Sequence, residues 1–137
     1  MNENREYKSD VFSMLMENKS YALEVYNALN HSDYRNPEEV EIIRLERGIS
    51  LSIRNDASFL IDMSMSFYEH QSTYNPNMPL RSAIYYVNTL EDWLRRKNLD
   101  LFSRKRIQIP TPHFVVFYNG TEKRPEYEEM RLSEAFC

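Results

Sequence analysis

The pattern of apolar and polar positions divides the chain into helical and extended segments. Residues 9–30 predict helix, because apolar residues recur from Val11 to Leu29 at the three-to-four spacing of one helix face. The polar run Asn18-Lys19-Ser20 favours a division into two helices there, with Ser20 as a candidate N-cap. Residues 30–37 are polar and predict a loop.

From Val40 the periodicity changes to two, which is typical of half-buried strands. Apolar residues alternate with polar ones between residues 43 and 53, and Gly48 marks a turn or bulge. The following segment SFLIDMSMSFYEHQS (58–72) predicts two more strands that meet near residues 62–64. The sequence therefore indicates a run of two or three strands after the first helical region.

A second helix and a last strand follow. Residues 79–97 predict a helix whose core stripe consists of Leu80, Ile84, Val87, Leu90 or Glu91, and Leu94. HFVVFYN (113–119) is a nearly continuous apolar run and predicts a buried central strand. A helix between the strand run and this strand permits a right-handed parallel crossover. The order α-β-β-β-α-β predicts an α/β fold with a mixed sheet flanked by helices.

Composition suits one globular domain over residues 1–137, with 42% hydrophobic and 28% charged residues. Two glycines are too few for the glycine-rich loops that bind phosphates or dinucleotides. The one cysteine, Cys137, excludes a disulfide within the chain and a cysteine-based zinc site. The polar N-terminus and the lack of 18 consecutive apolar residues predict a cytoplasmic protein with no membrane partner.

Charge is unevenly distributed. The net charge of −4 argues against an obvious nucleic-acid binder, because phosphate contacts need a basic surface. Residues 122–134 are strongly acidic, yet a basic cluster occupies twelve residues and contains Arg95, Arg96, Lys97, Arg104, Lys105 and Arg106. Two interpretations stay open: a solvated helix end favoured by the helix dipole, or a surface that tracks a DNA backbone.

A candidate site lies on the predicted strands. Glu69 and Gln71 are two residues apart, so their side chains share one face of a strand, whereas His70 points to the other. A hairpin would return Glu69 close to Asp56, and two such carboxylates suit Mg²⁺. A metal there could activate water, which the Gln71 amide could orient without acting as a base. The alternative is that these are ordinary surface groups.

The segment RNDASFLIDMSMSFYEHQSTYNPNMPLR (54–81) resembles the signature block of a bacterial family, the PD-(D/E)XK nuclease family transposases or recombination-promoting nucleases. Its ND dipeptide corresponds to the family's PD half-motif, and YEHQST carries the E-x-K half-motif in the form E-x-Q. The later segments IPTPHFVVFYNGTEKRPE and RLSEAF look similar to family blocks, as does YKSDVFSMLMENKSYALEVYNALN near the N-terminus. The resemblance covers nearly the whole chain.

This resemblance implies a restriction-endonuclease-like fold and a DNA endonuclease that uses Mg²⁺ or Mn²⁺. Asp56, Glu69 and the backbone carbonyl of His70 would bind the metal, and Gln71 would take the place of the usual lysine. Asp10 is a candidate accessory acid, although Ser9-Asp10-Val11-Phe12 is displaced by one residue from the family pattern D-S-V-F. The basic cluster and Arg81, which begins the long helix, would contact DNA phosphates. For Arg81 the alternative is a salt bridge within the protein.

Two departures keep alternatives open. Glutamine in place of lysine removes a positive charge from the site, and family members usually continue well beyond the LSEAF block, so the chain is expected to lack their C-terminal part. Together with the net charge, these departures favour a rival interpretation, a non-catalytic DNA-binding or protein-interaction module. A third alternative is a chain that is stable only as a homodimer, through apolar surface that the missing part would cover.

Overall fold

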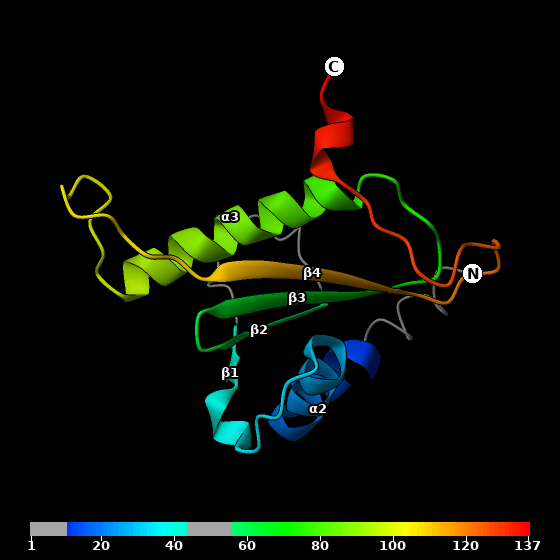
Figure 1. The fold of residues 1–137 in the computed structure, drawn as a ribbon, viewed down its shortest axis with the longest axis horizontal. Helices are drawn as coiled ribbons and strands as arrows, with labels where there is room; N and C mark the ends of the chain where they lie inside the picture. Colours follow the sequence, from blue (N-terminus) through cyan, green and yellow to red (C-terminus); the bar gives the residue numbers. More distant parts are fainter. Residues whose placement is uncertain (1–10, 44–55) are drawn as a thin grey trace.

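A computed structural model describes residues 11–43 and 56–137 of the chain (Figure 1). Residues 11–16 are helical, and the mixed α/β order predicted from the sequence is confirmed for the described elements. The elements are α2 (Lys19–Asn30), η1 (Pro37–Glu39), β1 (Glu41–Ile42), β2 (Ala57–Ile61), β3 (Ser64–Gln71), α3 (Met78–Arg96), β4 (Thr111–Tyr118) and η2 (Leu132–Ala135). The predictions for Asp10, Gly48 and the strand segment at residues 49–53 lie outside the described residues.

The first helical region divides where the sequence predicted, but its cap is a different residue. Asn18, not Ser20, is the N-cap of α2, because the Asn18 side chain accepts a hydrogen bond from the backbone N–H of Tyr21 at 3.1 Å. This satisfies one of the unpaired donors at the helix start. Ser20 lies inside the first turn, so the prediction of a Ser20 cap was wrong.

The four described strands form one mixed sheet in the order β1-β2-β3-β4. β2 and β3 are an antiparallel hairpin that turns at Asp62 and Met63, and Asp62 has a φ of 52°, a conformation that aspartate tolerates. The Asp62 carboxylate accepts a hydrogen bond from the Tyr34 hydroxyl at 2.7 Å, which ties the turn to the loop after α2. β4 then pairs parallel to β3 after α3, as a crossover through a helix requires.

The sheet lies between two helical layers, with α2 on one face and α3 on the other (Figure 1). Because successive side chains of a strand point to opposite faces, the sheet has a hydrophobic core on each face. On the α2 face, Phe59, Ile61 and Tyr68 pack with Ala22, Leu23 and Tyr26. On the α3 face, the buried cluster consists of Leu60, Met65, Phe67 and Tyr85.

The bounds of α3 agree with the prediction, but its buried stripe does not. Leu80 and Val87 of the predicted stripe are 49% and 60% exposed. The buried side chains are Met78, Ser82, Tyr85, Thr89, Asp92 and Leu94, and three of these six are polar. Leu94 belongs to the predicted stripe, whereas the other five follow three-to-four spacing along a different face of the helix. Two of the buried polar side chains have partners within the helix, because Thr89 donates to the Tyr85 carbonyl and Asp92 pairs with Arg96.

β4 was predicted to be a buried central strand, and that prediction was wrong. Among the described residues β4 forms the edge of the sheet, and its side chains are half-buried or exposed, with Phe114 41% exposed. Its apolar residues contact both layers, because Phe114 packs on Phe67 whereas Val115 and Phe117 pack on the α2 side. A strand with apolar residues on both faces produces a continuous apolar run even at a sheet edge.

No helix in the described parts of the chain combines the length and the apolar character that crossing a membrane demands.

Candidate metal centre

The β2–β3 hairpin brings Asp56 and Glu69 together. Ala57 lies opposite Tyr68, and the antiparallel register continued by one residue places Asp56 opposite Glu69 on the face covered by α3. The backbone N–H of His70 donates a hydrogen bond to Asp56 Oδ2 at 2.8 Å, which fixes the Asp56 carboxylate against β3. Two residues thirteen positions apart in sequence therefore share one end of the hairpin.

Glu69 is buried, with 7% of its surface exposed. Its Oε1 accepts a hydrogen bond from Arg81 Nη2 at 3.1 Å and lies 3.4 Å from the Tyr85 hydroxyl. Arg81 and Tyr85 are four residues apart, so one face of α3 presents both side chains to the carboxylate. The other oxygen, Oε2, is buried and has no hydrogen-bond partner in the described parts of the chain.

The environment of Glu69 changes its ionisation. Burial raises the pKa of Glu69 to about 7; the Arg81 guanidinium opposes this, and the nearby Asp56 carboxylate adds to it. Burial, together with the Glu69 carboxylate, also raises the pKa of Tyr85 to about 12. Tyr85 therefore stays protonated near neutral pH and can donate its hydrogen bond to Glu69, which exchanges a proton in that range.

The residues present fit a hard divalent cation. Carboxylate oxygens from Asp56 and Glu69 are the type of ligand that Mg²⁺ prefers, and Mg²⁺ commonly uses one or two carboxylates and keeps several waters. The unpartnered Oε2 of Glu69 is a buried acceptor of the kind that a cation would satisfy. In the described residues no three His, Cys, Asp or Glu side chains gather closely enough to form a larger ligand set.

The other residues of the predicted site, Gln71 and His70, lie in different environments. The Gln71 amide Nε2 donates to the thioether Sδ of Met78 at 2.8 Å, which holds the amide beside the start of α3. The ring of His70 lies on the opposite face of the sheet, as predicted, with its centroid 6.0 Å from that of Phe12. Only the backbone of His70 can therefore take part in a site on the Glu69 face. Asp10, the candidate accessory acid, is not among the described residues.

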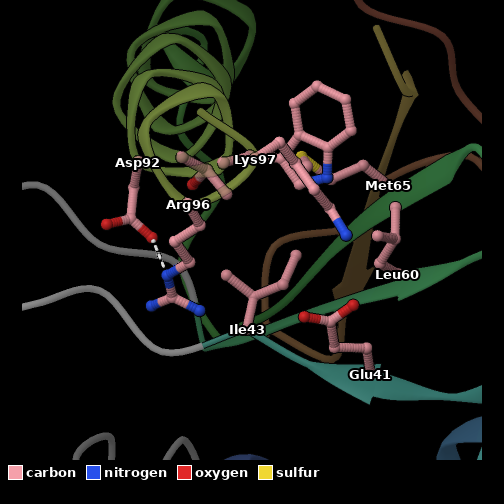
Figure 2. A pocket seen from close by; sticks show the side chains of 9 residues that line it. Glu41, Ile43, Leu60, Met65, Asp92, Arg96 and Lys97 are labelled. Atoms are coloured by element: carbon pink, nitrogen blue, oxygen red, sulfur yellow. Dashed lines mark ion pairs between the residues drawn. The ribbon is translucent and has the colours of Figure 1, made fainter. Parts of the chain in front are cut away.

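The predicted basic surface lies at the other end of α3 from this site. Arg95 and Arg96 form the last turn of α3, Lys97 is its C-cap, and the rest of the cluster lies in the exposed loop before β4. Arg96 has a structural role, because its Nε donates to the buried Asp92 carboxylate at 2.9 Å. Figure 2 shows this pair beside a small pocket of about 80 Å³, which Lys97 also lines.

Three details of the site were not assigned from the sequence: that Glu69 is the acid paired with Arg81, that Tyr85 is the tyrosine beside this pair, and that Gln71 contacts Met78. The i, i+4 spacing of Arg81 and Tyr85 was a signal that both side chains share one helix face. The sequence did not show which face of α3 lies over β3, so it could not link these residues to Glu69.

No protein-family model, curated protein or solved structure matches this chain. The family resemblance of residues 54–81 therefore stays a prediction.

Proposed function

We propose that this chain is a divalent-metal-dependent DNA endonuclease of the PD-(D/E)XK type, which hydrolyses phosphodiester bonds during recombination or the movement of a mobile element. The observation that carries the proposal is the buried Glu69 carboxylate, whose unpartnered Oε2 lies on the same face and at the same end of the hairpin as Asp56. A buried acid beside a second carboxylate is costly unless a proton or a cation compensates it.

The fold supports the same proposal. A restriction-endonuclease-like domain was predicted as a mixed sheet flanked by helices in the order α-β-β-β-α-β. The described chain has an antiparallel β1-β2-β3 set, a covering helix α3 and a parallel β4, with α2 on the far face of the sheet. In this arrangement Glu69 belongs to β3 and Asp56 directly precedes β2, the two inner strands of the described sheet.

Mg²⁺ or Mn²⁺, when bound, would supply Lewis-acid stabilisation of the phosphate charge and a more acidic water. Asp56 and Glu69 would hold the ion, with the His70 carbonyl as a third ligand. Gln71 would orient the attacking water through its amide, and Arg81 would pair with a phosphate oxygen. In hydrolysis the water oxygen bonds to phosphorus, the ester oxygen leaves, and one water proton passes to solvent while the other ends on the leaving oxygen.

A second candidate function is a non-catalytic DNA-binding or protein-interaction module with this fold. Two observations favour it. The Arg81 guanidinium already neutralises Glu69 at 3.1 Å, and Gln71 carries no charge where the family has lysine. A site that is neutralised by its own arginine can be stable without a metal.

Plasmid nicking separates the two functions. With Mg²⁺ or Mn²⁺, the wild-type chain is expected to nick supercoiled plasmid, and Asp56→Ala and Glu69→Ala are each expected to abolish nicking. Glu126→Ala is the matched control, because it removes an acid from the exposed C-terminal segment. Circular dichroism checks that each variant is folded. Cleavage that survives both site substitutions would overturn the assignment, and calorimetry showing no binding of millimolar Mn²⁺ to folded protein would favour the non-catalytic module.

A further inference from the structure

The loop that joins α3 to β4 projects beyond the end of the sheet (Figure 1, yellow). Its tip carries Leu101 and Phe102, which are 68% and 96% exposed. Single exposed apolar residues are common on protein surfaces. A phenyl ring that is almost completely exposed at a loop tip nevertheless makes its whole face available to a partner.

Hydrogen bonds within the loop define its shape. The Asp100 carboxylate accepts from the backbone N–H of Phe102 at 2.9 Å, and the Asp100 carbonyl accepts from the N–H of Ser103 at 3.1 Å. The Ser103 hydroxyl in turn accepts from the N–H of Lys105 at 3.2 Å. Such side-chain to backbone bonds stabilise a turn, so the loop presents Phe102 outward through its own structure.

Basic residues lie on both sides of Phe102 in the sequence. Residues 95–106 contain the six basic residues of the cluster and one acid, Asp100, whereas the whole chain carries −4. Arg104, Lys105 and Arg106 are exposed and form no ion pair with any residue in 11–43 or 56–137. A basic loop of this kind on an acidic protein is complementary to a polyanion.

We propose that this loop binds DNA that has unpaired bases, with Phe102 stacking on a base and Arg104, Lys105 and Arg106 contacting the flanking phosphates. The choice of DNA as the polyanion rests on the proposed function. An aromatic ring stacks on any exposed base, whereas entry into a duplex first requires a base step to unstack. The substrate class is therefore single-stranded, flapped or gapped DNA in preference to intact duplex.

The position of the loop relates it to the candidate metal centre along α3. Arg81 lies beside the candidate metal centre at the start of α3, and Lys97 begins the loop at its end. The rise of 1.5 Å per residue separates them by about 24 Å. At the stacked spacing of about 3.4 Å per nucleotide, roughly seven nucleotides span that distance, and an unstacked strand spans it with fewer.

Binding is measured in EDTA, so that cleavage does not enter the result. Fluorescence anisotropy with a labelled 20-nucleotide single strand and its duplex compares the wild type, Phe102→Ala and the triple variant Arg104→Ala/Lys105→Ala/Arg106→Ala. The wild type is expected to bind the single strand more tightly than the duplex. Phe102→Ala is expected to weaken single-strand binding about tenfold and duplex binding much less. The triple variant should reduce the slope of log affinity against log salt by about 2 for the single strand.

Phe136→Ala is the matched control, because Phe136 is 76% exposed and lies outside the basic cluster. The proposal is overturned if Phe102→Ala binds the single strand as well as Phe136→Ala does, or if it loses single-strand and duplex binding equally. It is also overturned if the loop variants lose only binding to vesicles of phosphatidylserine and phosphatidylcholine, which would assign the loop to an anionic membrane.

The nicking assay keeps the two proposals distinguishable. Loop-dependent single-strand binding, with no cleavage of either the plasmid or a flapped oligonucleotide in Mg²⁺ or Mn²⁺, supports DNA binding by the loop and refutes the nuclease. Nicking by the wild type, together with unchanged single-strand binding by Phe102→Ala, supports the nuclease and refutes DNA binding by the loop.

Discussion

Replacing Glu69 with glutamine removes the ionisable group of the candidate metal centre while keeping the shape of the side chain. The pKa of Glu69 is raised from 4.5 to about 7 in the folded chain, chiefly by burial. The folded state therefore holds this proton more tightly than the unfolded state does, so the associated stability is fully present below pH 4.5 and is lost as pH rises through 7. At 1.36 kcal/mol per pKa unit, the loss is about 3 kcal/mol, most of it between pH 5 and 8.

Denaturant unfolding at pH 5 to 8 tests this magnitude, with EDTA present and at low protein concentration. Trp93 is the one tryptophan and is half-buried, so its fluorescence reports unfolding. The free energy of unfolding of Glu69→Gln, minus that of the wild type, is expected to increase by about 2 to 3 kcal/mol across the range. Glu126→Gln, at an exposed position, should show no such trend. A difference for Glu69→Gln that does not change with pH would show that burial does not raise the pKa of this carboxyl. A difference that decreases as pH rises would show that the folded state lowers the pKa.

Two further predictions concern stability at sites away from Glu69. Asn18→Ala is expected to cost about 1 kcal/mol because it removes the N-cap of α2, whereas Ser20→Ala should change stability by only a few tenths; chemical denaturation of both variants checks this, and a larger loss for Ser20→Ala would restore the sequence-based cap. Phe59→Ala is expected to cost about 3–5 kcal/mol, because Phe59 is fully buried between Tyr26 and Tyr68. Thermal melts should place Phe59→Leu between this variant and the wild type, and a near-normal melt for Phe59→Ala would contradict the packing described on the α2 face.

The hairpin and the pairing of Asp56 with Glu69 followed from the sequence for a local reason. Two apolar segments between Ala57 and Gln71 indicate two strands, and the interruption at Asp62 leaves room for only a tight turn. A two-residue turn fixes the register of an antiparallel pair, so the residues that face each other can be counted directly. Charge and hydrogen-bonding partners from the same hairpin could be predicted in this way.

Features that depend on how distant elements dock were not predictable in the same way. The periodicity of α3 permits two stripes of similar spacing, and the more apolar one contains Leu80 and Val87, which are exposed. In the structure the stripe with Tyr85 and Asp92 is buried, where Tyr85 lies beside Glu69 and Asp92 pairs with Arg96. The position of β4 at the edge also depends on the global strand order, on which its apolar run carries no information.

The outer edge of β4 has a consequence for how the protein behaves in solution. No strand within residues 11–43 and 56–137 pairs with the outer side of β4, and such an edge offers backbone N–H and C=O groups to another chain. The run from Phe114 to Phe117 adds apolar side chains on both faces. Pro112 interrupts the row of donors near the start of the strand, but no proline follows in residues 113–118. The net charge of −4 at pH 7 keeps molecules apart, and this repulsion vanishes toward the pI of about 5.4. Edge-to-edge association is thus favoured by mild acid and high concentration, so the strand that completes the sheet also limits the conditions in which the protein stays dispersed.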